Sequence, residues 1–160
     1  MTSPQNVGLG ELIISRHPED ILVAYGLGSC LGIGMFDPVA RVAGLLHAVL
    51  PESSNGDGSS SKYVTSGIKN LIEGMVKAGA NQSRLVTRMA GGANMLVCVS
   101  LSQAFEIGSR NINAAHRTLQ QFNLRLAAEE VGGNVGRTVK LYVVTGKLTV
   151  RMVGGIEHEL

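Results

Sequence analysis

Residues 20–50 read DILVAYGLGSCLGIGMFDPVARVAGLLHAVL and contain three short apolar runs separated by turn-forming residues. The runs cover residues 20–25, 31–36 and 42–50, and each is bounded by Gly, Pro or Asp. Short apolar runs with such boundaries are typical of buried β-strands. Asp37-Pro38, between the second run and the third, is a turn signal. This part of the chain therefore predicts consecutive strands in the protein core.

The rest of the chain predicts two helices and further strands. Two segments carry an apolar stripe at helical spacing, and two others alternate around Thr145-Gly146 as in a β-hairpin. Strands outnumber helices and do not alternate with them regularly, which favours an α+β layered fold with mixed sheets and two main helices packed on a sheet. The predicted helices cover residues 62–80 (Val64, Ile68, Leu71, Ile72, Met75, Val76) and 109–122 (Ile112, Ala115, Leu119, Phe122); the predicted strands cover 84–90, 124–130, 137–144 and 147–152.

The length of the chain, 160 residues, predicts a single domain over residues 1–160. Hydrophobic residues make up 44% and charged residues 16%, a composition that excludes an intrinsically disordered protein. Residues 52–61 read ESSNGDGSSS and lack apolar side chains, so we expect a flexible surface loop there. Residues 153–160 are expected to form a short C-terminal tail.

Charge and cysteine content exclude several classes of partner and cofactor. The formal net charge is +2, and there are three Phe, three Tyr and no Trp, so no basic-aromatic surface for nucleic acid is expected. No signal peptide and no run of ~18 apolar residues is present, which predicts a cytoplasmic protein without membrane insertion. Cys30 and Cys98 are the only cysteines and have no metal-ligand spacing, so reduced thiols and no metal site are expected.

Two Gly-rich segments are similar to nucleotide-binding loops but lack required residues. Residues 26–31 carry Leu where the third Gly of a dinucleotide-binding motif belongs, and residues 131–138 have Arg137 where a P-loop has Lys. Each segment also leads into a predicted strand, so no helix N-terminus is available to bind phosphate. We therefore expect no nucleotide cofactor.

Cys30 and His47 form the one candidate catalytic pair. His47 lies inside an apolar run, where an imidazole needs a hydrogen-bonding partner. Cys30 lies where a Gly-rich turn meets a strand, and backbone N–H groups around Gly28 and Ser29 can form an oxyanion hole. If the strands that carry Cys30 and His47 are neighbours in a sheet, the two side chains form a nucleophile–base pair. An imidazolium next to Cys30 would then lower the pKa of its thiol. The alternative, a buried apolar Cys and a satisfied core His, stays open from spacing alone, whereas Cys98 is expected to pack in the core.

Several sequence segments resemble CheD, the chemoreceptor glutamine deamidase family. The resemblance runs from about residue 8 to residue 151, and its most specific parts are the GSC, HAVLP and GGNVGRT sequences. The matching segments are YGLGSC (25–30), FDP (36–38), LHAVLP (46–51), KY (62–63), GGA (91–93), IGSRN (107–111), EEVGGNVGRT (129–138) and TGK (145–147).

The resemblance implies an enzyme that hydrolyses selected glutamine side-chain amides of methyl-accepting chemotaxis receptors, giving glutamate and ammonia. It implies Cys30 as nucleophile, His47 as base, no cofactor, and a layered fold related to bacterial toxin-type cysteine deamidases. It also implies a CheC-type phosphatase as a partner. Which receptor glutamines are modified, and the oligomeric state, do not follow from the sequence.

One position departs from the family pattern. Six residues before the Cys the family usually has Thr, whose hydroxyl helps to orient the imidazole, and this chain has Ala24. Strand alternation places Ala24 on the same face as Leu22 and Gly26. The missing hydroxyl supports one alternative to an active deamidase, a weakly active or inactive binding module that regulates a CheC-type phosphatase. A separate alternative, a structural or redox-sensing thiol protein, predicts oxidation of Cys30 without turnover.

Overall fold

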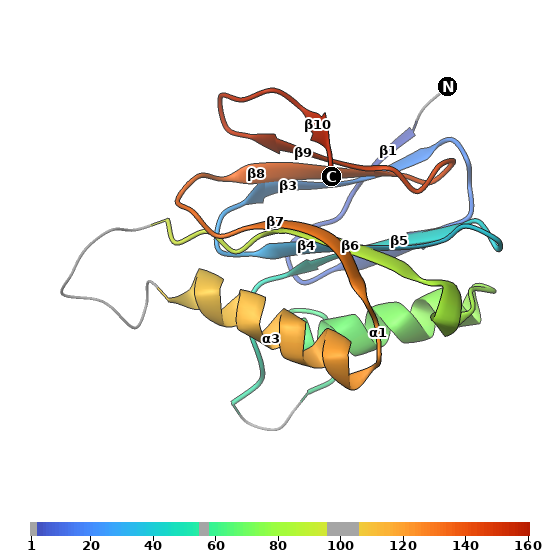
Figure 1. Cartoon of the computed structure of the whole chain (residues 1–160), viewed down its shortest axis with the longest axis horizontal. Coiled ribbons are helices and arrows are strands. Elements are labelled where there is room, and N and C mark those ends of the chain that lie inside the picture. The colour runs from blue at the N-terminus through green and yellow to red at the C-terminus, as the bar shows by residue number, and fades with distance from the viewer. Residues whose placement is uncertain (1–2, 55–57, 96–105) are drawn as a thin grey trace.

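The computed structural model of the chain describes residues 3–54, 58–95 and 106–160, which form three layers (Figure 1). Two layers are β-sheets, and the third contains two helices packed side by side. The α+β fold predicted from the sequence is confirmed. The elements are β1 Ser3–Asn6, β2 Leu12–Ser15, β3 Asp20–Leu27, β4 Leu31–Asp37, β5 Val42–Ala48, α1 Val64–Lys77, a 3₁₀ helix Gln82–Arg84, β6 Val86–Gly91, α3 Ile107–Gln121, β7 Leu126–Val131, β8 Arg137–Tyr142, β9 Leu148–Met152 and β10 His158–Glu159.

The central sheet has the strand order β2-β5-β4-β6-β7, and the outer sheet has the order β1-β3-β8-β9-β10. Both sheets are mixed, since β1 pairs with β3 and β6 pairs with β7 in parallel, while the remaining pairs are antiparallel. The central sheet lies between the outer sheet and the helices (Figure 1), so its middle strands are covered on both faces. Every residue of β4 and β5 is buried. This double cover explains why both strands are continuous apolar runs in the sequence.

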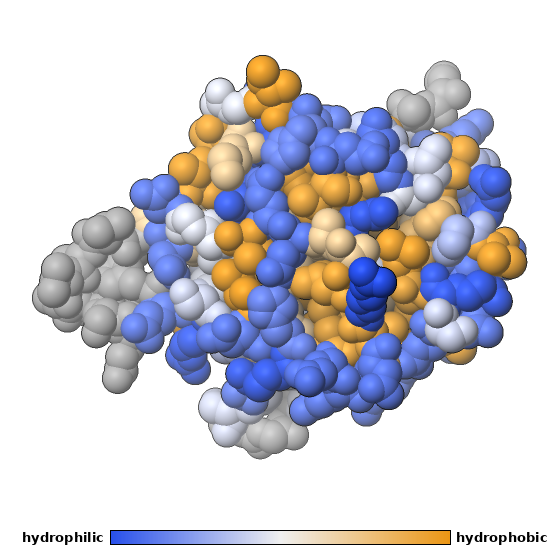
Figure 2. Space-filling model, viewed as in Figure 1, coloured by the Kyte–Doolittle hydropathy of each residue, from blue (hydrophilic) through white to orange (hydrophobic). Residues whose placement is uncertain are grey.

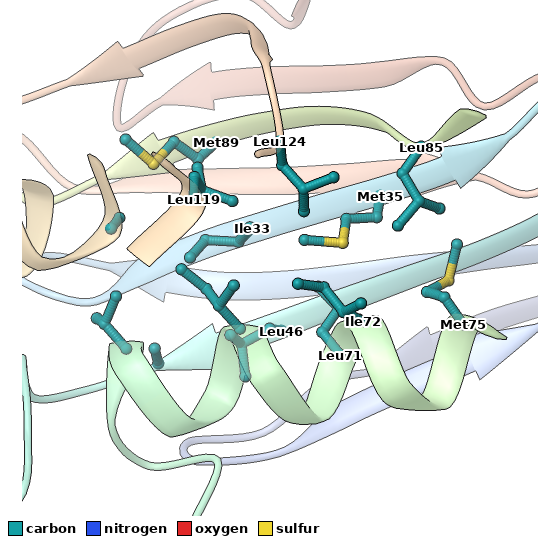
Figure 3. Packing of buried hydrophobic residues seen from close by; sticks show 14 of the residues in the cluster. Ile33, Met35, Leu46, Leu71, Ile72, Met75, Leu85, Met89, Leu119 and Leu124 are labelled. Atoms are coloured by element: carbon teal, nitrogen blue, oxygen red, sulfur yellow. The ribbon is translucent and has the colours of Figure 1, made fainter. Parts of the chain in front are cut away.

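The first hydrophobic core lies between the central sheet and the helices. Figure 3 shows Leu71, Ile72 and Met75 of α1 pointing toward Met35 and Leu46 of the central sheet. Full burial of each such side chain contributes roughly 1.5–3 kcal/mol, so this apolar stripe fixes the helix on the sheet.

The outer faces of the helices are hydrophilic, as Figure 2 shows along the lower edge of the molecule. Val76 was predicted to belong to the buried stripe of α1 but is 46% exposed. Val76 follows Met75 at the edge of the buried face of α1, and its side chain therefore points partly toward solvent. Within the described residues, no helix is long and apolar enough to cross a bilayer.

The second core lies between the two sheets and positions the site. Leu22 of β3 and Leu45 of β5 point into it from opposite sheets, together with Val139 and Leu141 of β8. The hairpin predicted around Thr145-Gly146 is confirmed as β8 and β9, although Met152 at its end is partly exposed. In the hairpin turn, Gly146 has φ +76° and lies against the ring of Phe36, so a side chain would not fit there.

Three strands were not predicted from the sequence. β1 and β2 are short, and the SPQN sequence of β1 lacks apolar alternation. The last eight residues, expected as a tail, turn back so that β10 pairs with β9. Strands at the edge of a sheet are held by backbone hydrogen bonds, which any residue type can make. Their sequences therefore show no characteristic pattern of apolar residues.

Candidate active site

Cys30 lies in the turn between β3 and β4. The turn begins with a β-bulge between Ala24 and Leu27, where Gly26 has φ +63°. Two backbone hydrogen bonds attach the turn to the segment after β6: Gly92 N–H donates to the Cys30 carbonyl and Ala93 N–H donates to the Gly28 carbonyl, each at 2.8 Å. The Cys30 side chain faces the core between the sheets and is 9% exposed. The turn is therefore held at both of its ends.

The strand register places His47 on the same face of the central sheet as Cys30. His47 of β5 is directly opposite Gly32 of β4, and Cys30 precedes Gly32 by two residues. Residues opposite each other in an antiparallel pair point to one side, and so do residues two apart along a strand. Cys30 and His47 are thus diagonal neighbours, a relation with a typical Cα separation of roughly 7–8 Å. Leu45 and Val49 share this face, as strand alternation predicts.

A backbone carbonyl orients the His47 ring. Nδ1 of His47 lies 2.9 Å from the carbonyl oxygen of Val7, and the ring is 3% exposed. Because a carbonyl can only accept, Nδ1 carries the proton and Nε2 of the neutral ring keeps its lone pair. Nε2 is buried and has no hydrogen-bond partner among the described residues. The free nitrogen is therefore an acceptor in the core between the sheets, which Cys30 also faces.

Val7 was not identified as a site residue from the sequence. Its N–H donates to Val23 O at 2.8 Å, which continues the pairing of β1 with β3 and fixes the carbonyl that His47 uses. The side chain is fully buried and apolar, so its residue type indicates only packing. The functional group is on the backbone and distant in sequence, which leaves no signal in the residue pattern.

Ala24 is fully buried in the core between the sheets and shares its face with Leu22, as predicted. Gly26 does not continue this alternation, because the β-bulge after Ala24 interrupts the register. Ala24 offers no hydrogen bond to His47. The Val7 carbonyl supplies an orienting acceptor that does not depend on the side chain at position 24.

The thiol of Cys30 does not have the lowered pKa expected for an ion pair. Burial raises the pKa of Cys30 above its ordinary value of 9.0, and the residue's own backbone N–H offsets part of this rise. A buried thiol is neutral because the low-dielectric surroundings disfavour the thiolate. The arrangement is a neutral thiol on the same sheet face as an imidazole whose Nε2 has no hydrogen-bond partner among the described residues. Such a pair can transfer the thiol proton when a substrate carbon is attacked.

This pKa shift predicts a pH dependence for alkylation of Cys30 by iodoacetamide. Thiolate is the reacting form, and a raised pKa lowers its population at neutral pH. The rate constant is therefore expected to keep rising from about pH 6 to beyond about pH 9, measured by mass spectrometry of the Cys30 peptide in a Cys98→Ala background. A plateau reached below neutral pH would instead indicate a preformed thiolate–imidazolium pair.

Asn111 of α3 contacts the turn that carries Cys30. Its Nδ2 donates to the carbonyl oxygens of Ser29, at 2.8 Å, and Val49, at 3.0 Å. Gly28 is close to Met95, since an added Cβ would lie 3.0 Å from Met95 Cγ. Gly28 and Ser29, predicted as the oxyanion loop, precede Cys30 in the same turn, and their catalytic role stays a prediction.

Other predicted features lie partly or wholly outside the described residues. Cys98 is outside them, and so are residues 55–57 of the predicted flexible loop. Of the described part of this loop, Ser59 and Ser61 accept hydrogen bonds from Asn70 of α1. The described residues contain no cluster of His, Cys, Asp or Glu that could hold a metal ion.

A family model described as CheD chemotactic sensory transduction matches residues 49–152. The chain is also 44% identical to "Probable chemoreceptor glutamine deamidase CheD" of Symbiobacterium thermophilum, over 96% of this chain and 95% of that protein. The chain belongs to the CheD family. "Chemoreceptor glutamine deamidase CheD" of Thermotoga maritima is 40% identical over 95% of this chain and 94% of its own length. "Probable chemoreceptor glutamine deamidase CheD" of Thermococcus kodakarensis is 44% identical over 92% of this chain and 91% of its own length.

The solved structures add a comparison at the level of the fold. The crystal structure of the Bacillus licheniformis hypothetical protein YfiH has a TM-score of 0.51 and 10% sequence identity with this CheD-family chain. The similarity covers 77% of this chain and 51% of the YfiH chain, so the matched region is about half of that structure. The arrangement of sheets and helices therefore also occurs in a protein with little sequence similarity.

Proposed function

We propose that this CheD-family protein hydrolyses side-chain amides of glutamine residues on chemoreceptors, in the cytoplasm, with Cys30 as nucleophile and His47 as base. The relatives that carry the deamidase name align over nearly the whole chain. The single observation that supports the chemistry best is the buried, unpartnered Nε2 of His47, on the sheet face that also carries Cys30. A buried acceptor without a partner costs free energy, which is a reason to assign it a role during turnover.

In the proposed mechanism, Sγ of Cys30 attacks the carboxamide carbon of a substrate glutamine while the thiol proton moves to Nε2 of His47. The C=O π electrons shift to the oxygen, and backbone N–H groups of the Cys30 turn stabilise the resulting oxyanion. The imidazolium then returns the proton to the amide nitrogen, the C–N bond breaks and ammonia leaves. A thioester on Cys30 remains.

Water completes the cycle without a cofactor. His47 Nε2 takes a proton from the water as its oxygen attacks the thioester carbonyl. The C–S bond then breaks, the proton returns to Cys30, and the substrate leaves as glutamate. The Val7 carbonyl stabilises the imidazolium that forms in each half of the cycle, because it accepts from Nδ1 throughout.

The alternative of a regulatory module for a CheC-type phosphatase was suggested by the missing hydroxyl at Ala24. The Val7 hydrogen bond provides the orientation that this hydroxyl would supply, so we favour the enzyme. Binding to a CheC-type phosphatase remains compatible with catalysis, and we propose it only as an additional interaction.

The test is incubation of the purified protein with cytoplasmic chemoreceptor fragments. Ammonia release and a mass increase of about 1 Da at specific glutamines are expected, because an amide –NH₂ is replaced by –OH. The matched control is the Cys30→Ala protein at the same concentration. Receptor fragments that stay unmodified while a CheC-type phosphatase is stimulated would instead support the regulatory module.

Restoring the hydroxyl at position 24 is expected to give no gain in activity. Ala24 is fully buried, and extra atoms in a packed core cost roughly 1–3 kcal/mol. Since Val7 already accepts from Nδ1, Ala24→Thr should leave kcat within about threefold of the natural protein and lower its melting temperature. Deamidation kinetics and thermal unfolding of both proteins test this. A rise in kcat of tenfold or more would mean that the Val7 bond orients His47 poorly.

A further inference from the structure

Asn111 makes a bridge between the two segments that carry the proposed catalytic pair. Its side chain is fully buried, and the amide nitrogen donates to Ser29 O at 2.8 Å and Val49 O at 3.0 Å. Ser29 immediately precedes Cys30, and Val49 follows His47 by two residues. Because both partners are carbonyl oxygens, only the –NH₂ end of the amide can face them, which fixes the orientation of the side chain.

The Ser29 carbonyl and the Cys30 N–H belong to the same peptide unit. The described residues contain no cis peptide bond, so this carbonyl and this N–H point in opposite directions. Holding the carbonyl on Asn111 therefore directs the Cys30 N–H away from Asn111. A carbonyl that accepts a hydrogen bond also polarises its peptide unit, which makes the N–H a stronger donor.

The N–H and the carbonyl of Cys30 differ in their backbone hydrogen bonds. No described backbone carbonyl accepts from it, while the carbonyl of Cys30 is occupied by Gly92 N–H. The same N–H lies close enough to the Cys30 thiol to offset part of the rise in its pKa. A carbon bonded to Sγ would thus place its oxygen near this donor.

We propose that Asn111 is a positioning residue that holds the Ser29–Cys30 peptide unit so that the Cys30 N–H donates to the oxyanion of the tetrahedral intermediate. This inference rests on the proposed function only in taking Cys30 as the nucleophile. Loss of one oxyanion donor typically slows a reaction by about 10²–10³-fold. Without Asn111 the Cys30 N–H is still present but is no longer held in position. The reaction rate should therefore fall by a smaller factor than on removal of the donor, but by at least about tenfold.

Two small reagents separate this role from packing and do not require the receptor. With p-nitrophenyl acetate, Cys30 Sγ bonds to the ester carbonyl carbon, the thiol proton goes to His47 Nε2, and p-nitrophenolate leaves; this passes through an oxyanion. With iodoacetamide, Sγ displaces iodide from a saturated carbon, and no oxyanion forms. The ratio of the two rate constants therefore reports the oxyanion donor and cancels changes in thiol exposure or pKa.

The variant is Asn111→Leu, which keeps the size of the side chain and removes the donors, in a Cys98→Ala background. The ratio of acylation to alkylation is expected to fall at least about tenfold. Thr118→Val is the matched control, because Thr118 is also buried on α3 and its hydroxyl donates only within the helix, to Ala114 O at 2.7 Å. The ratio should not change in this control. If Asn111→Leu does not fold, Asn111→Ser, which is smaller and cannot reach both carbonyls, replaces it with the same expectation.

An unchanged ratio in the Asn111 variants would overturn the proposal, whether both reactions slow together or neither does. Absence of any acylation at Cys30 in the natural protein would overturn it as well. The proposed function fails separately: receptor fragments would release no ammonia with the natural protein, while the reagent ratio still responded to Asn111→Leu.

Discussion

Replacing Cys30 by alanine is expected to reduce receptor deamidation by at least about 10⁴-fold, because the proposed mechanism has no other nucleophile. The Cys30 side chain packs in the apolar core between the sheets, and among the described residues its thiol makes no hydrogen bond to another side chain. The carbonyl of Cys30 accepts from Gly92 and would do so equally from alanine. Removing one buried sulfur costs about 1 kcal/mol, so the variant should stay folded.

The measurement is ammonia release, with mass spectrometry of the same receptor fragment and circular dichroism of each variant. Cys98→Ala is the matched control, since it removes the other thiol and is expected to keep full activity. Turnover that persists in a folded Cys30→Ala protein would rule out the covalent mechanism. Loss of turnover in Cys98→Ala alone would mean that the nucleophile was assigned to the wrong cysteine.

Replacing His47 by asparagine is expected to reduce kcat by roughly 10²–10⁴-fold with little loss of stability. The Asn amide nitrogen can take the place of Nδ1 and continue to donate to the Val7 carbonyl. The base nitrogen Nε2, however, is removed. Activity and structure should therefore separate in this variant, with kcat and the melting temperature measured on the same preparation.

His47→Gln is the complementary variant. Its amide reaches toward the position of Nε2 and leaves the buried Val7 carbonyl without a donor, which costs roughly 1–3 kcal/mol. At roughly 2–4 °C per kcal/mol for a protein of this size, its melting temperature should fall clearly below that of His47→Asn. Both variants should show the same reduction of kcat, by roughly 10²–10⁴-fold. Equal stability of the two would contradict the role assigned to Val7, and an active His47→Asn protein would contradict His47 as the base.

Much of the strand and helix content was predictable because burial leaves a periodic or continuous apolar pattern. β4 and β5 are buried on both faces and appear as unbroken apolar runs, and α1 shows its stripe. β1 was missed, since an edge strand with the sequence SPQN is held by its backbone pairing with β3. β10 was missed for the same reason, and residues 153–160 are therefore not a free tail.

The sequence by itself determined the α+β class, the CheD family and the identity of Cys30 and His47 as the candidate pair, since these depend on residue types and their order. Only the tertiary structure decided how the pair is arranged. The Val7 carbonyl that holds His47 and the Ser29 carbonyl held by Asn111 are backbone groups, present at every residue and therefore invisible in residue type. The pKa of Cys30 likewise follows from burial, which depends on what the fold places around the thiol.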